Sequence, residues 1–159
     1  YSMTSRSLRM HARALVSRLR PAMLLCATFC GCAASATEAQ QSCVEALDLQ
    51  CAPAYAPSFE GIYTNLLSKS CGAPGTGNVC HSAEGLKGGL DLSDIERSYN
   101  SLLGTGGGAA RVLPGDPTCS VLVARLESTD PATRMPVGST LSVGERCVVR
   151  KWIADGAAR

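Results

Sequence analysis

The chain has 159 residues, of which 18% are charged and 4% aromatic, and its formal net charge is +2. Five arginines precede residue 37, so the remaining 123 residues hold ten basic and thirteen acidic side chains and a net charge of −3. This balance, without a basic stripe interleaved with aromatic residues, excludes a nucleic-acid-binding protein.

Residues 1–36 have the pattern of an export signal. A basic stretch without acidic residues precedes an apolar run over residues 22–33, and Ala34 to Ala36 form a small-residue cleavage site. The apolar run is too short to span a bilayer as a stable helix. We therefore expect export to the periplasm or cell surface. A second interpretation makes Cys32 a lipidated N-terminus, which would anchor the protein to a membrane.

After a predicted linker at residues 37–57, one domain is expected over residues 58–159. From residue 58 the apolar side chains recur at helical spacing and predict an amphipathic helix that runs into Cys71. Residues 72–79 contain three glycines and one proline, which predicts a loop. Three further amphipathic segments follow, and no run alternates over the length of a strand. The sequence therefore predicts an all-α domain, a small fold of four to five short helices with long loops.

Each predicted helix begins at a residue that favours the N-cap position. Two of these residues stand in capping boxes, in which a glutamate follows a serine by three positions. Pro117 at the first helical position favours the third start, and Gly104 and Gly156 are expected to end the second and fourth helices. In chain order, the predicted N-caps are Ser58, Ser93, Asp116 and Ser142.

Six cysteines follow the predicted leader, and an even number in an exported protein implies disulfide bonds. A domain with so few large side chains needs such cross-links, or a cofactor, to complete its core. If Cys71 and Cys80 bind a cofactor, the remaining four cysteines allow three pairings. The pairs that we favour are Cys43 with Cys51, which are close in sequence, and Cys119 with Cys147.

The most informative pattern is Cys71, an eight-residue gap, and then Cys80 followed by His81. A histidine beside a cysteine pair, with a later methionine, is the ligand set of c-type haem with His/Met axial ligation. After the leader, His81 and Met135 are the only histidine and methionine. Met135 lies in a polar loop before Pro136, which is a poor position for core filler and a suitable one for a thioether directed at a metal. We therefore expect these two cysteines to bind haem, and His81 and Met135 to be the iron ligands.

The spacing leaves an alternative open, because the usual gap between haem-binding cysteines is two residues. Closing a loop four times longer costs only about 1.2 kcal/mol, so the energetics permit attachment. In the alternative, a Cys71–Cys80 disulfide closes the loop, His81 is an ordinary surface residue and Met135 fills the core. A zinc site lacks a second ligand pair, and nucleophilic catalysis lacks a second histidine to act as the base.

Five segments, taken in order, resemble one known family, the planctomycete-type cytochrome c domain of exported bacterial proteins. The segments are Leu66-Leu-Ser-Lys-Ser-Cys71 leading to Cys80-His81, Lys87-Gly-Gly-Leu-Asp-Leu92, Leu113-Pro-Gly-Asp-Pro117 with Ser120-Val-Leu122, Asp130 to Pro136, and Leu141-Ser142 through Trp152 to Ala157. The resemblance implies a cytochrome c fold of four or five helices, covalent haem through Cys71 and Cys80, and axial ligation by His81 and Met135. It also implies electron transfer in the periplasm or at the cell surface.

The predicted function is single-electron transfer by a monohaem protein whose partner is a redox protein, and no catalysis of its own is expected. In this role Trp152, Leu66 and Leu67 should pack near the haem, and Pro114 and Gly115 should border its pocket. The alternative function is a haem-free, disulfide-stapled binding or structural module at the cell surface.

Overall fold

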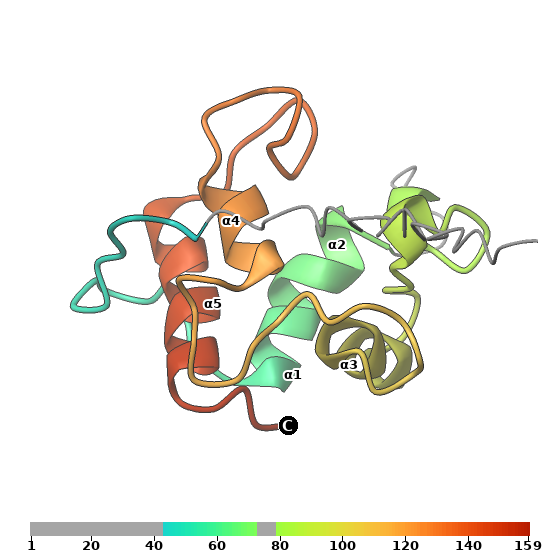
Figure 1. The fold of residues 1–159 in the computed structure, drawn as a ribbon, viewed down its shortest axis with the longest axis horizontal. Helices are drawn as coiled ribbons and strands as arrows, with labels where there is room; N and C mark the ends of the chain where they lie inside the picture. Colours follow the sequence, from blue (N-terminus) through green and yellow to red (C-terminus); the bar gives the residue numbers. More distant parts are fainter. Residues whose placement is uncertain (1–42, 73–78) are drawn as a thin grey trace, which may run out of the picture. The chain divides into compact units, whose positions relative to one another are not determined.

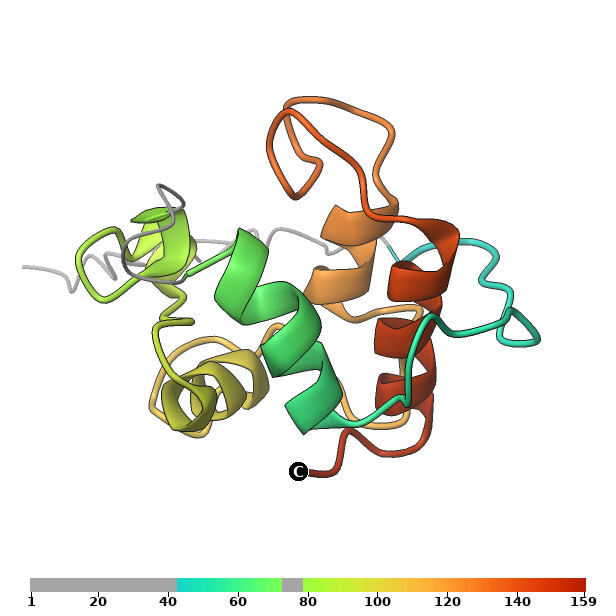
Figure 2. The same ribbon diagram turned by 180° about the vertical axis from the view of Figure 1, so that it is seen from behind.

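The computed structural model describes residues 43–72 and 79–159, which lie within one compact unit, Thr37–Arg159 (Figures 1 and 2). The predicted leader at residues 1–36, its alternative lipidation site Cys32 and most of the predicted 72–79 loop lie outside the described residues. The described part is helical and contains no β-strand, which confirms the all-α prediction for these residues. None of the helices described has the length and apolar character needed to cross a bilayer.

The first helical stretch is made of three consecutive segments, α1 (Phe59–Ile62), the π-helical η1 (Tyr63–Leu67) and α2 (Ser68–Ser70). It begins as predicted, because the Ser58 hydroxyl accepts a hydrogen bond from the backbone N–H of Gly61 at 3.1 Å. The wider turn of η1 ends with two leucines, Leu66 and Leu67, that are both buried. Single π turns are frequent at functional sites, and here the π-helical turn supplies part of a pocket wall.

Two short 3-10 segments, η2 (Val79–His81) and η3 (Lys87–Gly89), lead to α3 (Ile95–Leu103). Gly104 ends α3 in a left-handed conformation, as expected. The predicted N-cap Ser93 is wrong, and Asp94 caps the helix by accepting from the Arg97 N–H at 2.8 Å. The reason is that Ser93 is already engaged, since its N–H and hydroxyl both donate to Asp91 Oδ1.

The last two helices are α4 (Val121–Glu127) and α5 (Val143–Ala154). The capping box predicted at Ser142 and Glu145 is present at the start of α5. The predicted start of α4 at Asp116 is wrong, since Asp116 Oδ1 accepts from the Cys119 N–H as a capping residue would, but only a turn follows it. The helix itself begins after Ser120.

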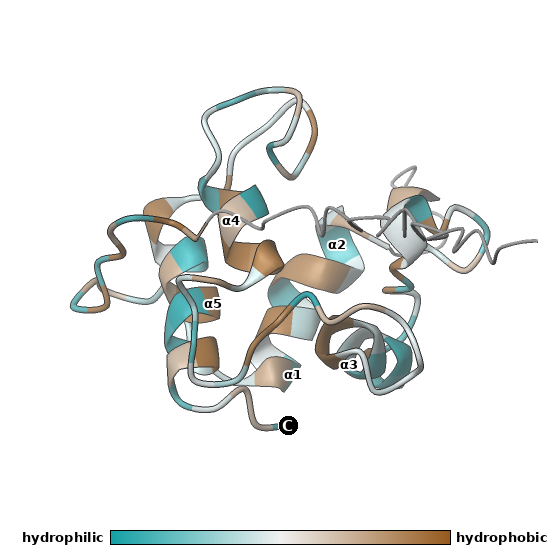
Figure 3. Cartoon of the chain, in the orientation of Figure 1, coloured by the Kyte–Doolittle hydropathy of each residue, from teal (hydrophilic) through white to brown (hydrophobic). Residues whose placement is uncertain are grey.

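The core lies where α1 meets α5, and it is built around the few aromatic side chains. Phe59 is fully buried, with its ring centroid 5.0 Å from Tyr99 and 5.4 Å from Trp152. The amphipathic character of α3 is visible in Figure 3, where apolar and hydrophilic residues occupy different faces of the helix. Burial of these rings supplies much of the apolar area that a small domain needs.

The disulfide pairing differs from the one that we favoured. The structure joins Cys43 to Cys119 and Cys51 to Cys147, so the predicted Cys43–Cys51 and Cys119–Cys147 pairs are wrong. The reason is that the segment before α1 extends along the domain. Val44 N–H donates to the Thr118 carbonyl at 2.9 Å, and Ala54 N–H donates to the Gly144 carbonyl at 3.1 Å. Each cysteine of this segment therefore meets a different partner.

A buried ion-pair cluster joins the same segment to the last two helices. Arg150 on α5, with a side chain 8% exposed, lies 2.7 Å from Glu127 Oε1 at the end of α4. Arg150 also donates to the Asp48 carbonyl at 3.0 Å, and Arg146 lies 3.1 Å from the second oxygen of Glu127. Both carboxylate oxygens of Glu127 are thus paired with arginines of α5. These ion pairs hold the end of α4, and the start of the loop that follows it, against α5.

We predict that replacing Cys43 and Cys119 together by serine lowers the free energy of unfolding by about 2–4 kcal/mol, because the unfolded chain regains the freedom of a long loop. Urea unfolding under non-reducing conditions measures the change. Peptide mapping without reduction should recover the 43–119 and 51–147 links. Recovery of a 43–51 peptide instead would contradict the structure.

Candidate functional site

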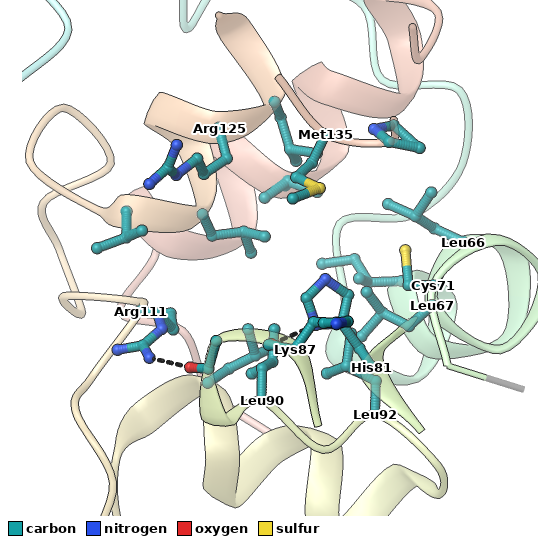
Figure 4. Close-up of a pocket in the computed structure, with 18 of the residues that line it drawn as sticks. Leu66, Leu67, Cys71, His81, Lys87, Leu90, Leu92, Arg111, Arg125 and Met135 are labelled. Atoms are coloured by element: carbon teal, nitrogen blue, oxygen red, sulfur yellow. Dashed lines mark hydrogen bonds between the residues drawn. The ribbon is translucent and has the colours of Figure 1, made fainter. Parts of the chain in front are cut away.

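One pocket of about 470 Å³ lies between η1, α4, the residues that follow η2 and the loop that contains Met135 (Figure 4). Its size falls in the range of small-molecule and cofactor pockets, and most of its wall is apolar. The apolar wall includes Ile62, Leu66, Leu67, Leu90, Leu92, Leu102, Leu122, Leu126 and Val149. Three of the four predicted site residues, Cys71, His81 and Met135, line this pocket.

Backbone hydrogen bonds place His81 in the pocket wall beside Cys71. The His81 N–H donates to the Cys71 carbonyl at 3.2 Å, and the Leu92 N–H donates to the His81 carbonyl at 2.6 Å. These two bonds hold the backbone at Cys71, His81 and Leu92 side by side without forming a β-sheet. The eight-residue gap is therefore compatible with close approach of its two ends.

Gly72 makes this close approach possible. A Cβ atom at Gly72 would lie 2.7 Å from both the Cβ and the carbonyl oxygen of Leu92, nearer than real Cβ contacts allow. Only glycine fits here without a shift of the Leu92 backbone, which itself is bonded to His81.

The His81 ring is held in one tautomer by its neighbour. Nδ1 lies 2.9 Å from the carbonyl oxygen of Lys87, which can only accept a hydrogen bond, so Nδ1 carries the proton. Nε2 of the neutral ring then keeps its lone pair, which is the arrangement of a histidine that ligates a metal through Nε2. Burial lowers the pKa of His81 from its usual value, against the opposing effect of the Lys87 carbonyl, so the ring is neutral at pH 7.

Met135 lies across the pocket from His81 (Figure 4). Its loop returns to α4, because the Met135 N–H donates to the Arg125 carbonyl at 2.9 Å, and the Arg125 guanidinium donates to the Thr133 carbonyl at 3.2 Å. Met135 is partly buried against the core, and in Figure 4 its thioether and the His81 imidazole point into the same space. An imidazole and a thioether thus face each other across a largely apolar cavity.

Cys71 and Cys80, the other two cysteines among the described residues, are not joined to each other, which excludes the Cys71–Cys80 disulfide in this structure. Cys71 lines the pocket, and burial together with the nearby Cys80 raises the pKa of its thiol to about 11. The Cys71 thiol is therefore protonated at neutral pH, unlike the thiolate of a catalytic cysteine. Cys80 is exposed and does not line the pocket.

Some pocket residues differ from those expected. Leu66 and Leu67 line it as predicted, but Trp152 packs on Phe59 instead, and its indole donates to the Ala158 carbonyl at 2.7 Å. Pro114 and Gly115 are not part of the wall.

Two wall residues that sequence reasoning missed are Arg111 and Arg125. Isolated arginines give no signal in a single sequence, because any surface position tolerates them.

The described residues contain no group of three or more His, Cys, Asp or Glu side chains able to hold a metal ion. This finding concerns sites built from three or more such side chains, and a site with one histidine and one methionine is not of that kind. No family model, curated protein or solved structure matches the chain.

We predict that Gly72→Ala lowers the free energy of unfolding by about 1–3 kcal/mol, because the new methyl group overlaps the Leu92 backbone. Denaturant unfolding measures the effect. Gly106→Ala is the control, since an added Cβ at Gly106 meets nothing within 4 Å. Equal losses in the two variants would show that Gly72 has no special packing role.

We also predict that His81 titrates below its usual value of 6.5 and carries its proton on Nδ1 above that pH. Because the folded state holds the proton less tightly, the stability contribution of the neutral ring is present above pH 6.5 and is lost as the pH falls through the lower folded value. Nitrogen-15 NMR of the histidine ring measures both properties, and His81→Gln distinguishes its signals from those of His11. A normal pKa with an Nε2 proton would contradict this assignment.

Proposed function

We propose that this protein binds haem in the pocket between His81 and Met135 and carries single electrons. The observation that supports this most strongly is the meeting of these two side chains across an apolar pocket with an unbridged Cys71 in its wall. They stand 54 positions apart in the sequence, and they are the only histidine and methionine after the predicted leader. An imidazole and a thioether with a thiol nearby are the donor set of c-type haem.

The residues present fit the group that this proposal requires. His81 Nε2 and the Met135 sulfur would bind the iron from opposite sides, and the Cys71 and Cys80 thiols would attach the porphyrin. When bound, the haem supplies a one-electron redox couple. The protein contributes a fixed imidazole tautomer through the Lys87 carbonyl and a wall of leucines that excludes water. A thioether ligand and an apolar surround both favour the reduced iron.

The unusual spacing of the cysteines is compatible with this role. The hydrogen bond between the His81 N–H and the Cys71 carbonyl brings the two ends of the gap together. Cys71 already lines the wall, whereas Cys80 is exposed next to His81. We infer that Cys71 forms the first thioether and that Cys80 reaches the porphyrin only after a local adjustment.

The wider context of the proposal follows from the fold class and the cysteines. The helical domain with α1 packed on α5 is consistent with the resemblance to cytochrome c-like domains. Two disulfides suit a protein that works outside the cytoplasm. We propose an exported electron carrier, in the periplasm or at the cell surface, whose partner is a redox protein. In this role the haem carries the redox chemistry, and no catalysis by the protein itself is proposed.

We predict that the exported chain, produced together with haem-attachment proteins, is red and shows a sharp absorption band after reduction with dithionite. A haem mass should remain on the polypeptide after denaturation, and Cys71→Ser should remove or weaken this covalent link. Met135→Ala should abolish the low-spin His/Met spectrum while the haem stays attached, because only the distal ligand is lost.

The matched control is Val137→Ala, which alters the same loop at a side chain that is 73% exposed and outside the pocket wall. It should keep the parent spectrum. A colourless product would overturn the haem proposal and favour the haem-free, disulfide-stapled module. A Met135→Ala spectrum identical to that of the parent would overturn the ligand assignment alone.

A further inference from the structure

The pocket has positive charge at its wall and no acidic side chain. Three cations line it, namely Lys87, Arg111 and Arg125, and the described lining residues include no aspartate or glutamate. In Figure 4 the two guanidinium groups lie on one side of the His81–Met135 pair, and Cys71 lies on the other. The two sides of the largely apolar pocket therefore differ, with a thiol on one side and two positive charges on the other.

The two arginines are positioned by backbone carbonyls and not by carboxylates. Arg111 donates to the Gly88 carbonyl at 2.6 Å and to the Ala109 carbonyl at 2.9 Å. Arg125 donates to the Thr133 carbonyl at 3.2 Å. Within the described part of the chain, neither guanidinium forms an ion pair. Each guanidinium has five N–H donors, so both keep several for a ligand.

This arrangement is unlike that of the arginines that stabilise the fold. Arg150 and Arg146 both form ion pairs with Glu127, and Arg97 is paired with Asp94. Two guanidinium groups in one pocket wall without counter-ions make the potential there positive, and an anionic ligand would be attracted to it. The wall between them and Cys71 is apolar, so the ligand that fits has an apolar body and an acidic edge.

We propose that Arg111 and Arg125 are the recognition site for the carboxylate groups of the bound ligand. The inference rests on the proposed function, for which the ligand is a porphyrin with two carboxylic acid side chains on one edge and two vinyl groups away from them. The acidic edge then faces the arginines, and a vinyl-bearing edge faces the Cys71 thiol. The arginines thereby select one orientation of the macrocycle and present the correct edge to the cysteine.

The test uses the full chain produced without haem, titrated with iron protoporphyrin and with its dimethyl ester, which lacks the two negative charges. The parent chain should bind the free acid about tenfold more tightly than the ester, because charge-assisted hydrogen bonds are lost in the ester. The Arg111→Gln/Arg125→Gln double variant should bind both forms equally. The preference of the parent should also decrease at high salt.

Two further variants keep the result interpretable. Arg125→Gln alone should reduce the preference. This substitution removes a single hydrogen bond, to the Thr133 carbonyl, so we expect the variant to fold. It therefore still tests the proposal if the double variant unfolds. Arg97→Gln, on the surface of α3 and outside the pocket wall, should leave the preference unchanged. Circular dichroism verifies the helical content of each variant.

The outcomes separate the two proposals. Equal binding of acid and ester by the parent chain, or an undiminished preference in the arginine variants, overturns the carboxylate site while haem binding stands. Binding of neither porphyrin by the folded parent overturns the proposed function, and the carboxylate site falls with it.

Discussion

The site depends on the pair of backbone hydrogen bonds that places His81 between Cys71 and Leu92. These bonds fix the histidine backbone in the wall, and the Lys87 carbonyl then fixes the ring. Glycine at position 72 is required for the same contact, since any side chain would overlap Leu92. A histidine held in one tautomer by packed backbone would need little reorganisation to bind a metal, as the proposed function requires.

The opposite side of the pocket is stabilised by a different kind of interaction. Met135 belongs to a long loop, which would be mobile if only its ends were fixed. Its N–H is bonded to α4, and α4 ends in the buried Glu127–Arg150 pair that joins it to α5. The disulfides to Cys119 and Cys147 connect the N-terminal segment to the start of α4 and to α5. Cross-links and this ion pair therefore add to the apolar core of a small domain.

Local sequence signals predicted the helices well and their exact starts less well. Ser58 and Ser142 cap helices as expected, because their hydroxyls have no competing partner. Ser93 does not, since it is bound to Asp91, and Asp116 makes a cap-type bond to the Cys119 N–H that only a turn follows. An N-cap residue is thus identified from sequence only when no neighbouring turn uses the same side chain.

The sequence by itself determined the helical class, two of the N-caps and the small set of residues able to ligate a metal, because these follow from local periodicity and residue chemistry. The tertiary structure decided which cysteines pair, because pairing depends on where the extended N-terminal segment lies. It also decided that His81 shares a pocket with Arg111, Arg125 and Met135, all of which lie at least 30 positions later in the chain. Such non-local proximity is fixed by packing of the whole domain, and no local pattern encodes it.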